Sequence, residues 1–300
     1  MDNSLILTMI DLIGKRKTNI LIENGFLNEC VKLSQEDILK CIENYKKIDS
    51  SFEVPNLEKI QNVIENSVKT LLESYKLGIK VTNIFNDDFP QKLKDIKDRA
   101  ILIFYRGDLN CLYEKKSIAV IGTRTPTKKG EEIGESLGYY YAKEGFVVVS
   151  GLANGCDTAA HKGCLKAGGK TVATLPCGLD KCYPNANNDL ANEIVKKGGC
   201  LISEYKIGTN PSKEKFIQRD RLQAALSLGV AVVECAIECG TMHTVGFAQK
   251  YKKKIAVSLH NETKSDIETV KGNLYLLENK GAIGLNNIDD YKKYINILML

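Results

Sequence analysis

A cluster of basic residues surrounds one aromatic ring between residues 213 and 221. Lys213, Lys215, Arg219 and Arg221 are four basic side chains within nine positions, and Phe216 lies among them. Positive charges that follow phosphates, beside a ring that stacks a base, are typical of sites for single-stranded nucleic acid. The alternative is that Phe216 belongs to the core and that the charges form the solvated end of a helix.

Two turns that contain Gly-Thr are candidates for phosphate binding. Gly122-Thr123-Arg124 and Gly240-Thr241 each follow an apolar run and precede a helical pattern. Glycine allows close approach of the backbone, and free N–H groups at a helix start attract anions. Arg124 is one of only six arginines among 42 basic residues, which favours a need for the bidentate guanidinium. An ordinary turn with a solvated arginine, or a simple capped helix start, is the alternative.

The loop from Ser150 to His161 contains two glycines and an asparagine and feeds a helix, which is typical of a ligand-facing loop. Asp157 is expected to cap that helix. Asp157 and His161 lie one turn apart on one helical face and have the residue types of a general acid and base. For His161 we favour a structural role, hydrogen-bonded to a neighbouring loop.

Two other features follow strands. Glu234 ends an apolar run and is expected to orient a nearby arginine or hydroxyl group. The turn over residues 176–184 is either a wall of the pocket or a plain connection.

Several familiar sites are disfavoured. After Gly122 the next glycine is Gly130, so the fingerprint GxGxxG of dinucleotide-binding proteins is missing. The stretch GGKT (168–171) ends a helix and enters a strand, the reverse of a phosphate-binding P-loop. Cys235, Cys239 and His243 have spacings longer than zinc sites favour and no evident fourth ligand. We therefore expect neither a metal nor a cofactor.

From Ser117 onward, short apolar runs alternate with helical patterns. This alternation predicts a parallel sheet covered by helices on both faces, a doubly wound α/β fold. Ligands of such folds bind at the carboxyl ends of the strands, where the candidate residues lie. The predicted strands are 118–121, 146–149, 171–175, 200–202, 230–233 and 255–259, and the predicted helices are near 128–144, 157–167, 186–197, 217–228 and 241–251.

The first 88 residues have a helical pattern. Apolar residues recur at helical spacing from Leu57 to Leu72, and Pro55-Asn56 is a plausible start for that helix. Ile20, Leu21, Leu27, Cys30 and Val31 indicate earlier short helices.

The composition is that of an ordinary globular protein. The chain has 300 residues, with 43% hydrophobic and 26% charged residues and a net charge of +5. No apolar run approaches the roughly 18 residues of a membrane helix, and the N-terminus does not resemble a secretion signal. We expect a cytoplasmic protein whose ten cysteines are reduced thiols.

The loops, in this order, resemble the DprA/Smf family of bacterial DNA-processing proteins. The resemblance runs from about residue 75 to 290, and SGLANGCDTAAH and FIQRDRL are its most specific parts. The matching stretches are DDFPQKLKDI (87–96), ILIFYRGDL (101–109), VIGTRTPTKKG (120–130), VVSGLANGCDTAAHKGCLKAGGKTVA (148–173), CGLDKCYP (177–184), LISEY (201–205), FIQRDRLQAALS (216–227), VVECAIECGTMHT (232–244) and GNLYLLENKGAIGL (272–285).

The resemblance implies a small helical, SAM-like N-terminal domain over residues 1–88 and a Rossmann-like DNA-binding domain over 89–300. It implies a homodimer that binds single-stranded DNA without catalysis and delivers it to the RecA recombinase in natural transformation or recombination. Carried over by position, the DNA-binding residues are Gly122, Thr123, Arg124, Gly151, Lys213, Phe216, Arg219, Arg221, Gly240 and Thr241.

The sequence departs from the family pattern at three places. Asp220 stands where the family usually has Asn between two arginines, and Cys239 stands where Ser is usual. Ser258-Leu259-His260-Asn261 replaces a typical Pro-Gly. From the chain length we expect no winged-helix domain of the kind that some members carry.

A different class of function fits the same fold. An enzyme or sensor for a nucleotide-derived ligand would use the Gly-Thr turns for phosphate and Asp157, His161 or Glu234 as acid or base. A small ligand would fill one pocket and compete with DNA, and turnover would depend on the carboxylates.

Overall fold

The structure, a computed structural model, describes residues 1–114, 116–259 and 267–300. It divides into two compact units, Met1–Phe104 and Tyr105–Leu300. The departure noted at Ser258-Leu259-His260-Asn261 lies partly outside the described residues, because His260 and Asn261 are not among them. None of the helices in the described ranges combines the length and the apolar character needed to cross a membrane.

The first unit is mostly helical. Asn56 accepts a hydrogen bond from the N–H of Lys59, which confirms the predicted helix start at this position. Leu27, Cys30 and Val31, expected in short helices, lie outside them. The elements are α1 (Asn3–Ile13), α2 (Lys15–Glu23), α3 (Gln35–Ile48), α4 (Leu57–Lys76), β1 (Lys80–Asn83) and α5 (Gln91–Lys94), and β2 (Leu102–Gly107) crosses the division.

The division falls later than the boundary expected at residue 88. Residues beyond that point bond back to the first unit. The Nε–H of Arg99 donates to Asn19 at 2.9 Å, and the N–H of Ile84 donates to the carbonyl of Ile101 at 3.0 Å. These bonds attach the segment after residue 88 to α2 and to the residue that follows β1.

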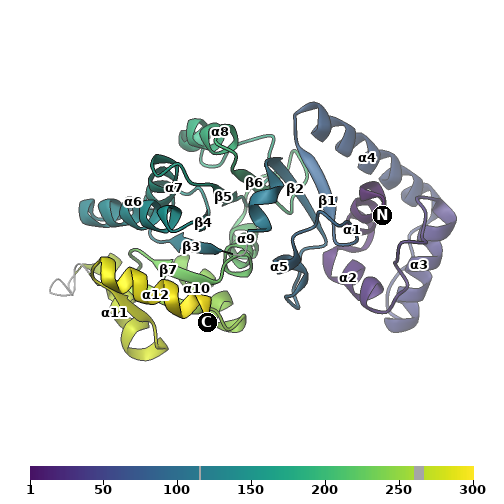
Figure 1. Cartoon of the computed structure of the whole chain (residues 1–300). Helices are drawn as coiled ribbons and strands as arrows, with labels where there is room; N and C mark the ends of the chain where they lie inside the picture. The colour runs from purple at the N-terminus through teal and green to yellow at the C-terminus, as the bar shows by residue number, and fades with distance from the viewer. Residues whose placement is uncertain (115, 260–266) are drawn as a thin grey trace. The chain divides into compact units, whose positions relative to one another are not determined.

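The second unit alternates strands and helices (Figure 1). Six of its strands and five of its helices occur where the sequence predicts them, with shifted ends. Its elements are η1 (Leu109–Leu112), β3 (Ser117–Ile121), α6 (Lys128–Lys143), β4 (Val147–Ser150), α7 (Cys156–Lys166), β5 (Thr171–Thr174), η2 (Asn185–Asn187), α8 (Asn188–Lys196), β6 (Cys200–Ser203), α9 (Lys213–Leu226), β7 (Gly229–Val232), α10 (Thr241–Lys250), β8 (Lys254–Ser258), α11 (Glu268–Lys280), β9 (Ile283–Leu285) and α12 (Ile288–Met299).

The strands of the second unit form a parallel sheet in the order β6-β5-β4-β3-β7-β8-β9. The chain starts at β3, adds β4, β5 and β6 on one side, and then crosses over to add β7, β8 and β9 on the other. The order therefore reverses beside β3, and the carboxyl ends of β3, β4 and β7 lie next to one another there. The doubly wound, Rossmann-like α/β fold is confirmed.

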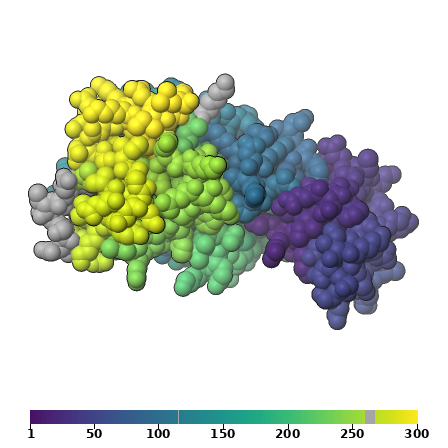
Figure 2. Space-filling model, turned by 90° about the horizontal axis from the view of Figure 1, so that it is seen from below, coloured from purple at the N-terminus to yellow at the C-terminus, as the bar shows by residue number. Residues whose placement is uncertain are grey.

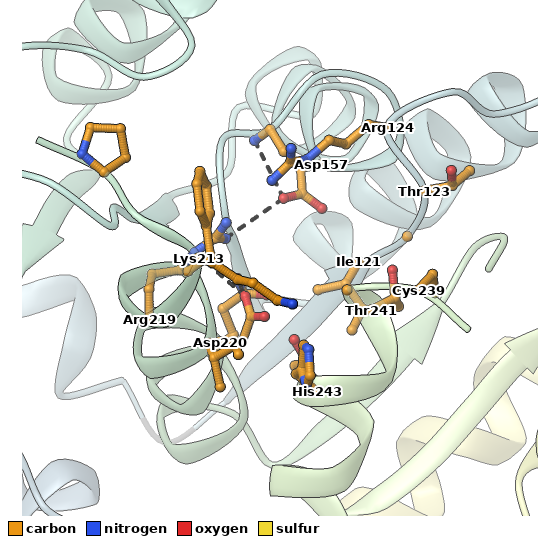
Figure 3. A pocket seen from close by; sticks show the side chains of 18 of the residues that line it. Ile121, Thr123, Arg124, Asp157, Lys213, Arg219, Asp220, Cys239, Thr241 and His243 are labelled. Atoms are coloured by element: carbon orange, nitrogen blue, oxygen red, sulfur yellow. Dashed lines mark hydrogen bonds and ion pairs between the residues drawn. The ribbon is translucent and has the colours of Figure 1, made fainter. Parts of the chain in front are cut away.

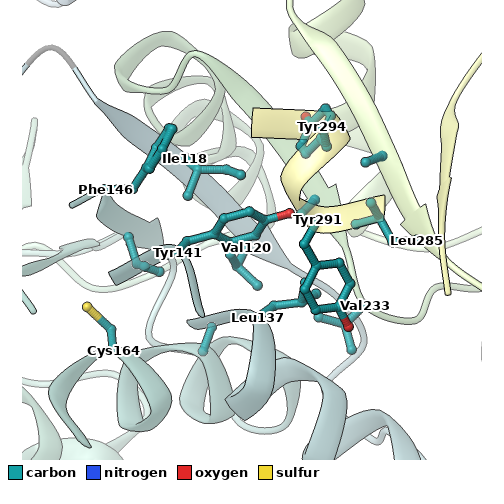
Figure 4. Packing of buried hydrophobic residues seen from close by; sticks show 14 of the residues in the cluster. Ile118, Val120, Leu137, Tyr141, Phe146, Cys164, Val233, Leu285, Tyr291 and Tyr294 are labelled. Carbon is teal, nitrogen blue, oxygen red and sulfur yellow. The ribbon is translucent and has the colours of Figure 1, made fainter. Parts of the chain in front are cut away.

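Both faces of this sheet are buried. Ile118 and Val120 of β3 pack with Leu137 and Tyr141 of α6 in one hydrophobic cluster (Figure 4). Ala119 and Ile121, which point to the opposite face, pack with residues of α9 and α10 in a second cluster. The C-terminal segment, yellow in Figure 2, lies against the part of the chain that follows β7. The N–H of Gly272 in α11 donates a hydrogen bond to the carbonyl of Cys235 there. A sheet covered on both faces leaves its strand ends as the place for a ligand.

The start of α9 differs most from the sequence prediction. The helix begins at Lys213 rather than near residue 217, because the hydroxyl of Ser212 accepts a hydrogen bond from the N–H of Lys215 and caps it. Lys213 and Phe216 are therefore helical, and their directions are set by the helix.

Candidate functional site

A cavity of about 670 Å³ lies at the carboxyl ends of β3, β4 and β7, where the strand order reverses (Figure 3). Its volume is within the range of small-ligand sites. The lining comes from five chain segments: the turn after β3, the loop and helix after β4, the turn after β5, α9 with the residues before it, and the start of α10 with the residues before it. Eight of the ten residues expected to bind line it: Gly122, Thr123, Arg124, Lys213, Phe216, Arg219, Gly240 and Thr241.

The turn after β3 is held by backbone hydrogen bonds. The N–H of Thr123 donates to the carbonyl of Glu234 at 2.7 Å, and the carbonyl of Thr123 accepts from Cys156 at 3.1 Å. A Cβ at Gly122 would come within 2.8 Å of the Glu234 carbonyl, so this close approach requires glycine. Arg124 follows the turn, and its guanidinium carbon lies 4.9 Å from the centre of the Phe216 ring.

Glu234 positions the entry to α6. Its carboxylate accepts from the N–H of Thr127 at 2.8 Å and from the Thr127 hydroxyl at 2.6 Å. The prediction that Glu234 orients a neighbouring hydroxyl is confirmed. The side chain is fully buried and does not line the cavity, so this geometry gives it no part in contacting a ligand.

The loop after β4 is organised by Asp157. The sequence predicts that Asp157 caps α7, and this prediction is wrong. Gly155 precedes that helix, and Asp157 is in its first turn. The carboxylate instead accepts from the N–H groups of Gly151 at 3.1 Å and Ala153 at 3.4 Å, and lies 3.9 Å from the Arg219 guanidinium. Burial raises the pKa of Asp157, and Arg219 opposes that shift.

Gly151 makes room for Arg219. A Cβ at this position would overlap the Arg219 guanidinium. Gly151 lines a smaller pocket of about 70 Å³ that shares Arg124, Phe216 and Arg219 with the main cavity. Its N–H already donates to Asp157, so its clearest role is to admit the arginine.

His161 has the structural role favoured from the sequence. It is fully buried, and its Nδ1 lies 2.7 Å from the Thr171 hydroxyl. The partner belongs to strand β5 rather than to a loop. Burial, with a smaller contribution from Arg219, lowers the pKa of His161 to about 3, so the imidazole stays neutral at ordinary pH.

Phe216 belongs to the cavity wall rather than to the core. It is half-buried, lines the cavity, and makes an edge-to-face contact with Tyr183 at 5.5 Å between ring centres. Tyr183 is 39% exposed and also lines the cavity, so the turn over 176–184 does form a wall. Sequence reasoning considered that wall but did not single out Tyr183 as part of the site.

The two arginines of α9 have different surroundings. Arg219 lines the cavity with 5% of its side chain exposed, between Asp157 and Asp220. Arg221 is only 1% exposed and forms an ion pair with Glu204. It does not line the cavity, so its expected contact with DNA is not compatible with its position. Its two-residue offset from Arg219 turns it about 200° around the helix.

Asp220 brings a carboxyl group into the cavity. Burial raises the pKa of Asp220 to about 7, Arg219 opposes the shift, and Asp157 adds to it. Asp220 therefore changes charge near neutral pH. Figure 3 shows Lys213, Arg219 and Asp220 projecting from α9, opposite Thr241 and His243 of α10.

Cys239 lies two residues before the start of α10 and lines the cavity. A hydrogen bond from the Cys235 thiol, followed by bonds from Met242 and Thr241, lowers the pKa of Cys239 to about 6. The hydrogen bond between the two thiols raises the pKa of the buried Cys235.

Across the described residues, no three His, Cys, Asp or Glu side chains converge in a way that would hold a metal ion.

The fold and the site define a Rossmann-like α/β protein with a cation-lined cavity at the switch point of its sheet. The chain belongs to the family of DNA recombination-mediator protein A, whose sequence model matches residues 80–296. This agrees with the DprA/Smf resemblance seen in the loops.

Individual relatives support this assignment. DNA processing protein DprA of Streptococcus pneumoniae is 40% identical over 162 residues, which cover 54% of this chain and 56% of that protein. Protein Smf of Synechocystis is 33% identical over 66% of this chain and 50% of its own length. The chain thus spans about half the length of these curated relatives.

Two solved structures have the same fold. The X-ray structure of DprA from Streptococcus pneumoniae is 26% identical, with a TM-score of 0.66, and covers 93% of this chain and 97% of that one. DNA processing protein A from Helicobacter pylori is 32% identical, with a TM-score of 0.64, over 73% of this chain and 96% of that one. The latter structure was described for its unique single-stranded DNA binding mode.

Proposed function

We propose that this cavity binds single-stranded DNA. The observation that carries the proposal is the meeting of Arg124, Lys213 and the Phe216 ring in one cavity at the strand ends. Arg219 is already placed between two carboxylates. Arg124 and Lys213, both exposed, are therefore the Lys and Arg side chains of the described lining best placed to meet phosphates.

Single strands suit this geometry better than duplexes. The Phe216 and Tyr183 rings form an aromatic corner that needs an unstacked base as its partner. Phosphate contacts and ring faces carry little sequence information, so both cations should act on all sequences alike.

We further propose that the protein acts without catalysis, as a mediator that protects incoming single-stranded DNA and delivers it to the RecA recombinase in natural transformation or recombination. A homodimer in the cytoplasm is the expected working form. The family assignment and the described DNA binding of the Helicobacter pylori relative support this role. The engagement of Asp157, His161 and Glu234 within the fold favours it over an enzyme that uses them as acid or base.

The first test is fluorescence anisotropy with a labelled oligothymidine and with a duplex of the same length, at 50 and 200 mM salt. If about four phosphates are neutralised, the single-strand affinity should fall roughly 50-fold over that range. Absence of binding to the single strand at 50 mM salt would contradict the proposal.

The second test assigns the site. Arg124→Ala should weaken binding to all single strands alike, and unchanged affinity would remove Arg124 from the interface.

The mediator role is then tested by RecA filament formation on single-stranded DNA coated with single-strand-binding protein. Faster filament formation in the presence of the protein supports delivery to RecA, and no acceleration opposes it.

A further inference from the structure

Four residues of α9 form a row along the cavity. Lys213, Phe216, Asp220 and Gln223 are spaced three, four and three positions apart, so they lie on one face of the helix, and all four line the cavity. At a rise of 1.5 Å per residue, Phe216 and Asp220 are about 6 Å apart along the axis, and Gln223 lies about 4.5 Å further on. The row presents, in order, a cation, a ring, a carboxylate and an amide.

The far end of this row has hydrogen-bond acceptors that the protein does not use fully. Arg219 Nε and Gln223 Nε2 each contact the Asp220 carboxylate at 3.5 Å, and both contacts are to the same oxygen, Oδ1. Gln223 is only 2% exposed, and its Oε1 has no hydrogen-bond partner among the described residues. A buried acceptor that lines a cavity without a donor favours a ligand that supplies one.

The chemistry of a matching ligand follows from these acceptors. Within single-stranded DNA, guanine has two adjacent donors on its Watson–Crick edge, the N1–H and the N2 amino group. Thymine has one imino donor between two carbonyl oxygens, which a carboxylate would repel. Adenine and cytosine have an amino group beside a ring acceptor. Two neighbouring acceptors therefore select guanine among the four bases.

We propose that the cavity prefers a guanine nucleotide within single-stranded DNA, with Asp220 and Gln223 accepting hydrogen bonds from the guanine edge. The inference rests on the DNA-binding function proposed above. The base lies against the aromatic corner of Phe216 and Tyr183, and Lys213, at the other end of the row, meets the phosphate. Low sequence specificity, expected from phosphates and rings, then applies to the other nucleotides of the bound strand.

The ionisation of Asp220 gives the preference a pH dependence. Burial raises the pKa of Asp220 to about 7, so the carboxylate is a full acceptor at pH 8 and is largely protonated at pH 6. The charged groups that face it are Arg219 on its own helix, Asp157 of α7 and Arg124 of the turn after β3. Lys213 on α9, Cys239 just before α10 and His243 on α10 line the same cavity. Guanine donors favour the ionised form, and the preference should therefore grow with pH.

The experiment compares short oligothymidines that carry one central dG, dA, dC or inosine, measured by competition anisotropy at pH 8. We expect dG to bind about tenfold more tightly than dT, within the range for a base contact with two hydrogen bonds. Inosine, which keeps N1–H but lacks the amino group, should fall between them. Asp220→Asn, a change of similar size, should bring the ratio of dG to dT affinity close to one. Lys213→Ala should weaken dG and dT strands equally.

The outcomes separate this inference from the proposed function. Equal affinity for all central bases, a preference for another base, or an unchanged dG preference in Asp220→Asn overturns the guanine assignment while DNA binding stands. Failure of every strand to bind overturns the proposed function itself. Gln223→Leu gives an independent check, because it removes the unpartnered oxygen and should also reduce the dG preference, with thermal unfolding used to verify that the variant is folded.

Discussion

On the side of α9 that lines the cavity, Lys213 and Asp220 reach a space open to a ligand, whereas on the side of Arg221 the guanidinium is enclosed with Glu204. Both sides of the helix carry charged residues, but only those on the cavity side can contact a charged ligand. The comparison shows that a basic segment in a sequence combines two separate tasks. Arg221 is paired with Glu204 inside the fold, and Lys213 is exposed in the cavity, where the proposed ligand would meet it.

The strongest test of this difference between the two sides of α9 removes the buried charge of Arg221. Arg221→Met removes the cation that is paired with the buried Glu204 carboxylate, which should lower the free energy of unfolding by about 3–5 kcal/mol. Urea denaturation measures the loss. The double variant Arg221→Met/Glu204→Leu should recover much of the stability, since a well-packed apolar pair often replaces a buried ion pair without loss. A single variant as stable as the parent would mean that Arg221 is not structural.

A substitution at Gly151 tests the packing of Arg219, which lies between the cavity side and the Arg221 side of α9. In Gly151→Ala the new methyl group would overlap the Arg219 guanidinium, so we expect a stability loss of about 1–3 kcal/mol. DNA affinity should fall as well, because Arg219 must leave its place. Gly246→Ala on α10 is the matched control, since a Cβ there meets nothing within 4 Å. In a thermal unfolding series, equal effects of both changes would argue against this packing.

The open side is tested by Lys213→Ala. Loss of one phosphate contact should weaken binding to single strands of any sequence and reduce the slope of log affinity against log salt by about 0.7. Stability should hardly change, because the side chain is exposed. Lys196→Ala, an exposed lysine of α8 that does not line the cavity, is the control and should leave the affinity as it was.

A smaller effect is expected from pH. Because the pKa of Asp220 is raised to about 7, raising the pH from 6 to 8 converts a neutral carboxyl into an anion in the same cavity as Arg124 and Lys213, the two cations proposed to meet phosphates. Affinity for oligothymidine should therefore fall a few-fold over this range, by ordinary charge repulsion. Titration by anisotropy should show the fall in the parent and a flatter profile in Asp220→Asn. A profile that persists in Asp220→Asn would assign the titration to another group.

The smallest effect concerns the two thiols after β7, which repeat the contrast between an enclosed and an open group. Cys239 lines the cavity with its pKa lowered to about 6, and Cys235 is fully buried. Iodoacetamide should modify Cys239 before Cys235, at a rate that rises with a midpoint near pH 6. Bound single-stranded DNA should slow this reaction. Mass spectrometry identifies the modified residue, and labelling of Cys235 before Cys239 would contradict the arrangement.

The sequence predicted the sheet well and the side-chain contacts less well. Apolar runs such as Ile118–Ile121 indicate buried strands directly, because every residue is apolar. The start of α9 was missed, since the cap at Ser212 competes with the stronger apolar pattern that begins later. Spacing alone could not distinguish Arg219 from Arg221, because the partner Glu204 comes from a different segment.

Other parts of the site were beyond sequence reasoning for the same reason. The sequence predicts a helix cap at Asp157, but its partners are the N–H groups of the loop that turns back over it. Gln223 could have been found from its position seven residues after Phe216 on the same helical face. The exposure of Tyr183 toward Phe216 depends on the path of the turn over 176–184, which no local pattern predicts.

The enclosed pair of Arg221 and Glu204 also has a thermodynamic consequence for the opposite side of the helix. Turning α9 by one residue would rotate its side chains by about 100° and would pull the Arg221 charge away from its partner. The row from Lys213 to Gln223 is therefore preorganised, and a strand that binds there should lose little affinity to the ordering of protein side chains. The same rigidity prevents the row from adapting to a ligand of another shape.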